Sequence, residues 1–205
     1  VVYGALRAGL IVVNTNPLYT ASEIKHQLND SGAKALVVLA NIAKNAASVI
    51  KDTSVEHVIV TELADLHPPL KRVLINWVVK YVKKMVPAFT FPSQVSMTSI
   101  FSSKGWTWKP VEADPNDVAV LQYTGGTTGV AKGAMLTHRN ILANVAQSYE
   151  FFKGEMEIGK EKILTVIPLF HVFGMTSCMN LSVYTASELI MLPRFELEEV
   201  LQTIK

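Results

Sequence analysis

Residues 122–138 read QYTGGTTGVAKGAMLTH, and residues 123–133 within them hold four glycines, three threonines and one lysine. Ordering a glycine costs more backbone entropy than ordering any other residue, and this run buries little apolar surface in return. Glycines let the backbone approach a ligand closely, so that successive N–H groups can converge on an anion. With threonine hydroxyls as further donors and Lys132 as a mobile cation, the run predicts a cradle for a polyphosphate.

Other structures for this run account for it less well. A plain glycine-rich hairpin explains the Gly125–Gly126 pair but not the Thr-Thr pair or the lysine. The P-loop pattern G-x-x-x-x-G-K-[ST] needs Ser or Thr after its lysine and then a helix, whereas here Gly133 follows Lys132 and GAMLTH reads as a second strand. The spacing of the glycines also departs from the dinucleotide pattern G-x-G-x-x-G.

Short apolar runs such as AKALVVLA and VEHVIVTE alternate with helical segments along most of the chain. This alternation is typical of an α/β fold, and it predicts layers of largely parallel sheets flanked by helices. Thr20 with Glu23 forms a capping-box pattern, and Asn41 and Thr137 are further candidate N-caps.

The pattern divides the chain into an αβ unit at 1–62, a connecting region at 63–112 and an αβ unit at 113–205 that carries the glycine loop. The chain opens inside an apolar periodic segment and stops inside an amphipathic helix. Because termini usually lie at frayed surface positions, we expect an internal piece of a longer protein.

The connecting region holds a basic amphipathic helix, expected over 70–86, within a stretch of five cations and no acid at 70–92. At 100° per residue, one face collects Arg72, Asn76 and three lysines, and the opposite face is apolar. The apolar runs are too short to cross a bilayer. Two interpretations stay open: the apolar face packs on the core, or the helix lies on an anionic membrane surface.

Composition sets the class of protein. Apolar residues make up 49% of the chain and charged residues 18%, which is typical of a folded globular protein. A formal net charge of +2 gives no support for nucleic-acid binding. The single cysteine, Cys178, cannot form an internal disulfide, so a reducing compartment fits, and its apolar surroundings predict a packing role.

The run YTGGTTGVAKG matches [YF]-T-[SG]-G-[ST]-[ST]-G-x-[PA]-K-G at all eleven positions. On this match the chain is identified as a member of the adenylate-forming superfamily, which includes acyl-CoA synthetases, adenylation domains of peptide synthetases and luciferases. Together with AMLTHRN, which follows it, the sequence of this segment most resembles that of bacterial long-chain fatty-acid–CoA ligases. PLFHVFGM, at 168–175, resembles the second family motif, which lines the acid-binding pocket.

The resemblance implies a ligase that converts a long-chain fatty acid and ATP, with Mg²⁺, to acyl-AMP and then, with coenzyme A, to acyl-CoA. The expected location is the cytoplasm, with a peripheral position at the inner face of the membrane as the alternative. The resemblance implies three catalytic residues: Lys132, Thr128 and His171. It implies nucleotide binding by Tyr123, Thr124, Gly125, Gly126, Thr127, Thr128, Gly129, Lys132 and Gly133. It implies acid binding by His171, Phe170, Phe173, Gly174 and Met175, although His171 could equally be a buried, hydrogen-bonded core histidine.

The chain also departs from the family pattern. It lacks the Y-G-x-T-E segment that contributes adenine contacts and a Mg²⁺ ligand, the later T-G-D, and the C-terminal domain with its catalytic lysine. These residues alone are therefore expected to be inactive, and no metal ligand is assigned within them. Three alternatives stay open: a ligase for a medium-chain or aryl acid, a catalytically silent phosphate-binding module, and a peripheral membrane protein with an incidental loop.

Overall fold

A computed structural model gives the fold of this chain and describes residues 1–103, 107–125 and 131–205. The residues fall into two compact units, one made of Val1–Asn16 with Pro110–Lys205 and the other of Pro17–Lys109. The divisions expected at 62 and 112 differ from this partition. The first sixteen residues join the later unit because β1 (Val12–Asn14) pairs with β5 (Val118–Thr124), more than a hundred residues further along the chain.

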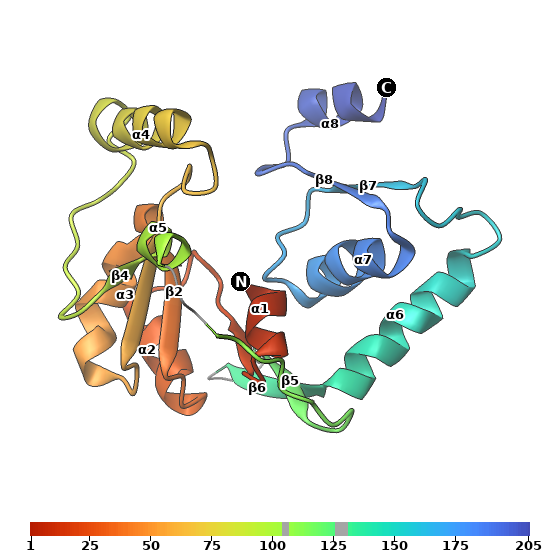
Figure 1. The fold of residues 1–205 in the computed structure, drawn as a ribbon, viewed down its shortest axis with the longest axis horizontal. Helices are drawn as coiled ribbons and strands as arrows, with labels where there is room; N and C mark the ends of the chain where they lie inside the picture. Colours follow the sequence, from red (N-terminus) through yellow and green to blue (C-terminus); the bar gives the residue numbers. More distant parts are fainter. Residues whose placement is uncertain (104–106, 126–130) are drawn as a thin grey trace. The chain divides into compact units, whose positions relative to one another are not determined.

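The first unit holds two small sheets and the helices that follow their strands. In one sheet β1 is parallel to β5 and β5 is antiparallel to β6; in the other, β7 is parallel to β8. Ala119 and Val120 of β5 are fully buried and pack with Met175. The elements, in chain order (Figure 1), are α1 (Val2–Arg7), β1, β5, β6 (Lys132–Thr137), α6 (His138–Phe152), β7 (Lys162–Thr165), η4 (Gly174–Asn180, a π-helix), α7 (Leu181–Thr185), β8 (Glu188–Met191) and α8 (Leu197–Ile204).

The second unit is built on one parallel sheet in the order β2-β3-β4. Buried apolar residues of α2 and α3, among them Ile24, Leu28 and Ala43, pack with Val38 and Val58 of the sheet. The elements are α2 (Ala21–Asp30), β2 (Ala35–Leu39), η1 (Ala40–Ile42), α3 (Ala43–Val49), η2 (Ile50–Asp52), β3 (His57–Thr61), α4 (Pro69–Trp77), η3 (Val78–Val82, a π-helix), β4 (Val95–Ser96) and α5 (Met97–Ser102). The predicted fold class, largely parallel sheets with helices, is confirmed.

Local cap chemistry starts two of the helices as the sequence predicts. Thr20 accepts a hydrogen bond from the Glu23 backbone N–H, and the Glu23 carboxylate accepts one from the Thr20 N–H at 2.8 Å. Thr137 starts α6 through a similar exchange with Asn140. The prediction for Asn41 is wrong: it lies inside η1, and its side-chain amide donates to the Met85 carbonyl at 3.2 Å instead of capping α3.

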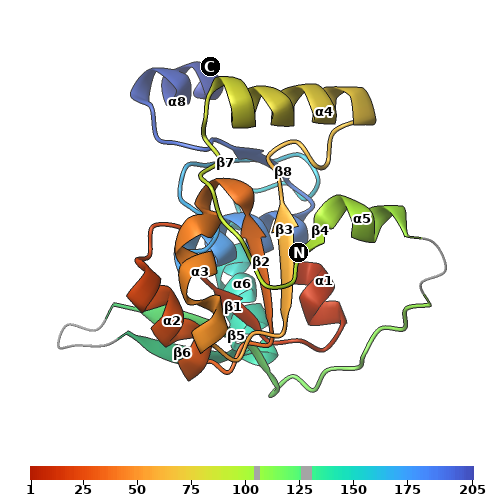
Figure 2. The same cartoon turned by 90° about the vertical axis from the view of Figure 1, so that its left-hand side faces the viewer.

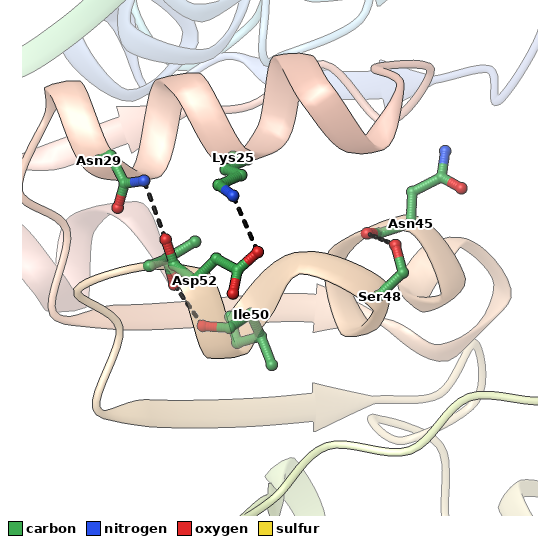
Figure 3. A network of polar contacts seen from close by, with 7 residues as sticks. Lys25, Asn29, Asn45, Ser48, Ile50 and Asp52 are labelled. Atoms are coloured by element: carbon green, nitrogen blue, oxygen red, sulfur yellow. Dashed lines mark hydrogen bonds and ion pairs between the residues drawn. The ribbon is translucent and has the colours of Figure 1, made fainter.

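Polar contacts join α2 to the chain that follows α3 (Figure 3). The Lys25 Nζ lies 2.8 Å from the Asp52 Oδ2, and the Asn29 Nδ2 donates to the Asp52 carbonyl at 3.0 Å. The charged groups of this pair are exposed to solvent, which screens their attraction, so the pair adds little to stability. The buried apolar contacts of α2 and α3 with the sheet supply most of the stability of this unit.

The basic helix is shorter than the expected 70–86. The helical segment begins at Pro69 and ends with η3 at Val82, because Lys84 adopts a φ of 51° in the left-handed region and cannot continue a right-handed helix. The packing of its apolar face on the core is also not observed, since Leu74, Tyr81 and Val82 are each about 60% exposed. In the described ranges, no helix combines the length and apolar character that crossing a membrane requires.

Candidate active site

The glycine loop joins two antiparallel strands. β5 and β6 pair with Tyr123 opposite Gly133 and Thr124 opposite Lys132, so the loop leaves and returns at one end of a hairpin. The predicted strand–loop–strand order is therefore confirmed, and the strand–loop–helix order of a P-loop is excluded. Gly126, Thr127, Thr128 and Gly129 lie outside the described residues, so their assigned contacts with the nucleotide remain predictions.

Tyr123 and Gly133 fit each other across the hairpin. Tyr123 is only 7% exposed, and a Cβ added to Gly133 would lie 2.9 Å from the Tyr123 Cε2. Real Cβ atoms do not approach a carbon this closely, so a side chain at 133 would displace the ring. The ring of the aromatic residue at the start of the motif therefore fills the space that a side chain at the final glycine would need.

Polar groups stand at the ends of the two strands where the glycine loop begins. Thr124, Gly125 and Lys132 are exposed, and a Cβ built on Gly125 would meet no atom within 4 Å. The antiparallel register sets the Thr124 hydroxyl and the Lys132 ammonium on opposing strands at the point where the loop begins. A hydroxyl donor and a cation at this position can neutralise negative charge on phosphate oxygens.

His171 lies at the surface of the first unit, which excludes the alternative of a buried core histidine. Its backbone N–H donates to the Pro168 carbonyl at 3.0 Å, and the Phe173 N–H donates to the His171 Nδ1 at 3.2 Å. Because Nδ1 accepts this bond, the neutral ring carries its proton on Nε2. The Nε2–H is a donor that can bind a carboxylate oxygen.

The residues after His171 turn sharply into η4. A Cβ on Gly174 would lie 2.6 Å from the Pro168 carbonyl oxygen, so glycine is needed here for close contact between backbone segments. Met175 is 1% exposed and belongs to the core with Ala119 and Val120. Phe173, in contrast, is 53% exposed, and Phe170 is half-buried.

Two polar residues that the sequence analysis did not single out connect the hairpin to the His171 segment. The Gln122 Nε2 donates to the Phe170 carbonyl at 3.3 Å. The Asn14 Nδ2 donates to the Gln122 Oε1 at 3.1 Å and lies 3.3 Å from the Met175 Sδ. A glutamine in the otherwise apolar strand VAVLQYT was the available signal, because a polar side chain buried in a strand needs partners.

An apolar depression of about 490 Å³ lies in the same unit, next to this segment. None of the residues predicted to bind the acid line it; its walls are Tyr3, Leu169, Met179, Ser182, Val183, Ala186, Ser187, Leu189 and Met191.

Cys178 is buried nearby without a disulfide, in agreement with its predicted packing role. Over the part of the chain that the structure describes, no group of three His, Cys, Asp or Glu side chains could hold a metal ion.

A family model described as AMP-binding enzyme matches residues 1–205. The chain belongs to the AMP-binding enzyme family. One relative, the long-chain-fatty-acid–CoA ligase of Escherichia coli O157:H7, is 49% identical over 85% of this chain and 31% of its own length. The long-chain-fatty-acid–CoA ligase of Bacillus subtilis (strain 168) is 38% identical over 98% of this chain and 36% of its own length.

Solved structures agree with the assignment to the AMP-binding family. The crystal structure of a long-chain-fatty-acid-CoA ligase from Archaeoglobus fulgidus superposes with a TM-score of 0.74 and 29% identity, over 99% of this chain and 34% of that one. The predicted resemblance to adenylate-forming enzymes is thus confirmed. The chain spans about a third of the length of the relatives that it matches.

Proposed function

We propose that the protein carrying this chain activates a long-chain fatty acid with ATP, forming acyl-AMP and then acyl-CoA. The observation that carries the proposal is the β5–β6 hairpin, whose register sets Thr124 and Lys132 across from each other where the glycine loop begins. Ligases named for long-chain fatty acids among the relatives support the substrate class.

The first step brings two anions together. A carboxylate oxygen forms a bond to the α-phosphorus of ATP, the bond from that phosphorus to the bridging oxygen breaks, and pyrophosphate leaves with the electron pair. The chain's contribution is to offset negative charge on the leaving group, through the Lys132 ammonium, the hydroxyls of Thr124, Thr127 and Thr128, and the N–H groups of the glycines.

The His171 segment would orient the acid. The Nε2–H of His171, set by the hydrogen bond at Nδ1, would donate to one carboxylate oxygen and leave the other to attack. Phe170 and the exposed Phe173 would contact the first carbons of the acyl chain, and Gly174 and Met175 would shape the pocket behind them. Positioning of this kind lowers the barrier because the reactants are held in the attacking geometry.

Coenzyme A is the acceptor in the second step: its sulfur bonds to the acyl carbon, the bond from that carbon to the phosphate oxygen breaks, AMP leaves with the electron pair, and the thiol proton is released. We propose Mg²⁺ as the ion that accompanies ATP, bound through the phosphates. A long-chain acid partitions into lipid, so we propose that the protein works in the cytoplasm with peripheral contact with a membrane surface.

ATP–pyrophosphate exchange by the protein expressed from its whole reading frame tests this proposal. The acids run from acetate through medium-chain acids to palmitate, with benzoate as the aryl comparison. Exchange that rises with chain length is the expected result. Exchange confined to short or aryl acids would keep adenylation and reject the long-chain substrate, and a folded, ATP-binding protein without exchange would reject the enzyme.

A further inference from the structure

The helix formed by α4 and η3 turns an apolar stripe to solvent. Its members recur at helical spacing and are 53% to 84% exposed: Leu70, Val73, Leu74, Trp77 and Tyr81. The Trp77 and Tyr81 rings lie 6.3 Å apart. Figures 1 and 2 show α4 beyond the ends of the strands of its own unit.

Polar contacts on the other side of the helix fix this orientation. The Ala64 N–H donates to the Asn76 Oδ1 at 3.0 Å, and the Asn76 Nδ2 donates to the Asp65 Oδ1 at 3.3 Å. Asp65 is 8% exposed and accepts a further bond from the Glu62 N–H at 2.8 Å. Asn76 is thus held inward by partners in its own unit, whereas Trp77, Tyr81 and Leu74 lie roughly 100° to 160° away from it around the helix and are exposed.

The helix that carries the stripe has only positive charges of its own, whereas Glu62 and Asp65 of the preceding segment line a hollow together with Lys80 and Tyr81. No aspartate or glutamate occurs between Asp65 and Glu112, while five cations lie at 71–84. At 100° per residue, Lys71 and Lys80 fall on the two flanks of the stripe. The Lys80 Nζ also lies 5.4 Å from the centre of the Tyr81 ring. Aromatic rings with flanking lysines that can extend to the headgroups are typical of helices at a membrane interface.

A second exposed apolar helix in the same chain shows that exposure alone does not identify a lipid surface. Leu197, Leu201 and Ile204 of α8 are 51% to 68% exposed, but Glu198 and Glu199 accompany them in the first turn. An acidic helix of this kind would be repelled by anionic lipid. The flanking lysines therefore make the α4 stripe a better candidate for lipid binding than the α8 face, which is exposed and apolar but acidic.

We propose that the outward face of α4 and η3 binds an anionic lipid surface, with Trp77 and Tyr81 at the headgroup level and Lys71 and Lys80 contacting lipid phosphates. This inference rests on the proposed function, because it names the surface through which a ligase for lipid acids would meet its substrate source. It develops the second interpretation of the basic helix, in which the helix lies on an anionic membrane surface, by naming the face that meets the lipid.

Sedimentation with lipid vesicles tests the proposal on the protein expressed from its whole reading frame. One vesicle preparation contains equal parts of phosphatidylcholine and phosphatidylglycerol, and the other contains phosphatidylcholine alone. We expect binding to the anionic vesicles that weakens with salt. Lys71→Glu with Lys80→Glu should weaken that binding by on the order of 100-fold, and Trp77→Ala by about tenfold.

The matched control is Lys44→Glu with Lys51→Glu, which changes the net charge equally at exposed positions on other elements of the same unit. It should bind anionic vesicles as the unchanged protein does. Equal loss in this control, equal binding to both preparations, or no effect of Trp77→Ala would overturn the proposal. So would the absence of vesicle binding in a folded protein, which would assign the stripe to a protein contact.

Pyrophosphate exchange with a water-soluble medium-chain acid separates this inference from the proposed function. The lysine variants and Trp77→Ala should retain exchange, because none of these residues belongs to the hairpin or the His171 segment. Vesicle binding that fails while exchange persists would reject the lipid surface alone. Exchange that fails in the unchanged protein would reject the ligase, whatever the vesicles show.

Discussion

The two parts of the candidate site, the hairpin mouth and the His171 segment, differ in how tightly they are packed. The hairpin mouth is open: Lys132 and Thr124 are exposed, and a Cβ built on Gly125 would meet none of the described atoms within 4 Å. The His171 segment is closed behind its surface histidine, with Gly174 against a backbone carbonyl and Met175 at 1% exposure. The first can change its ligand contacts without disturbing the core, whereas the second cannot. Substitutions in the hairpin should therefore affect activity, and those behind His171 should affect stability.

The largest effect is expected at Lys132. Lys132→Ala should lower the adenylation rate by roughly ten- to a thousand-fold, as for loss of one preorganised donor to the leaving group. The free energy of unfolding should change by less than about 0.5 kcal/mol, since the side chain is exposed. Exchange kinetics and urea unfolding measure the two quantities.

Lys162→Ala is the matched control for Lys132, because Lys162 is also the exposed first residue of a strand. It should leave both the rate and the stability nearly unchanged. A Lys132→Ala variant with the normal rate, or one that is unfolded, would contradict the prediction that hairpin substitutions affect activity and leave stability unchanged.

Gly174 tests the closed part. Gly174→Ala places a Cβ 2.6 Å from the Pro168 oxygen, and relief requires a backbone shift. We expect a loss of about 1–3 kcal/mol in the free energy of unfolding, measured by urea titration. Gly4→Ala, in α1 with no atom within 4 Å of the added Cβ, should be neutral or slightly stabilising. Equal stability of the two variants would contradict a close-packed turn at 174.

Gln122 joins the open and closed parts and should affect both properties. Gln122→Met keeps the volume but removes the bonds to the Phe170 carbonyl and the Asn14 amide. We expect a loss of about 1–2 kcal/mol and a higher KM for the acid, because the Phe170 segment is no longer tied to β5. Gln147→Met, on the exposed side of α6, is the control. Unchanged stability and KM would show that the two parts are independent.

The smallest expected effect is a difference in pH dependence between the N-terminal caps of α2 and α6. Hydrogen bonds from the Thr20 side chain and backbone lower the pKa of Glu23, so the folded state favours the carboxylate. This contribution to stability is present above the ordinary glutamate pKa and is lost as the pH falls through the lowered value of the folded state. The Thr137–Asn140 box beside the hairpin contains no titratable group and should not respond.

Unfolding midpoints measured from neutral to acid pH test this difference. The stability advantage of the unchanged protein over Glu23→Gln should shrink as the pH falls, whereas the loss caused by Asn140→Ala should stay constant. A constant advantage over Glu23→Gln would mean that the capping carboxylate does not titrate as its contacts indicate.

The features that could be predicted from the sequence are those determined by residues close together in the chain. The hairpin, the Thr20–Glu23 box and the short parallel strands each depend on a few neighbouring residues with defined hydrogen-bonding or turn chemistry. The Asn14–Gln122 bond and the pairing of β1 with β5 join residues more than a hundred positions apart, and no local pattern specifies them. For the same reason, the sequence left open whether the apolar face of α4 packs on the core or faces outward: Asn76 finds its partners outside the helix.

The contact between Tyr123 and Gly133 has an evolutionary consequence. A side chain at 133 would collide with the Tyr123 ring, so Gly133 cannot be substituted while the ring is present. Replacing Tyr123 by a smaller residue alone would leave an empty space beside Gly133. A lineage that lost the ring could admit alanine at 133, and one that kept the ring could not. The two ends of the motif should therefore be inherited as a pair, with a constraint between them that is separate from the nucleotide.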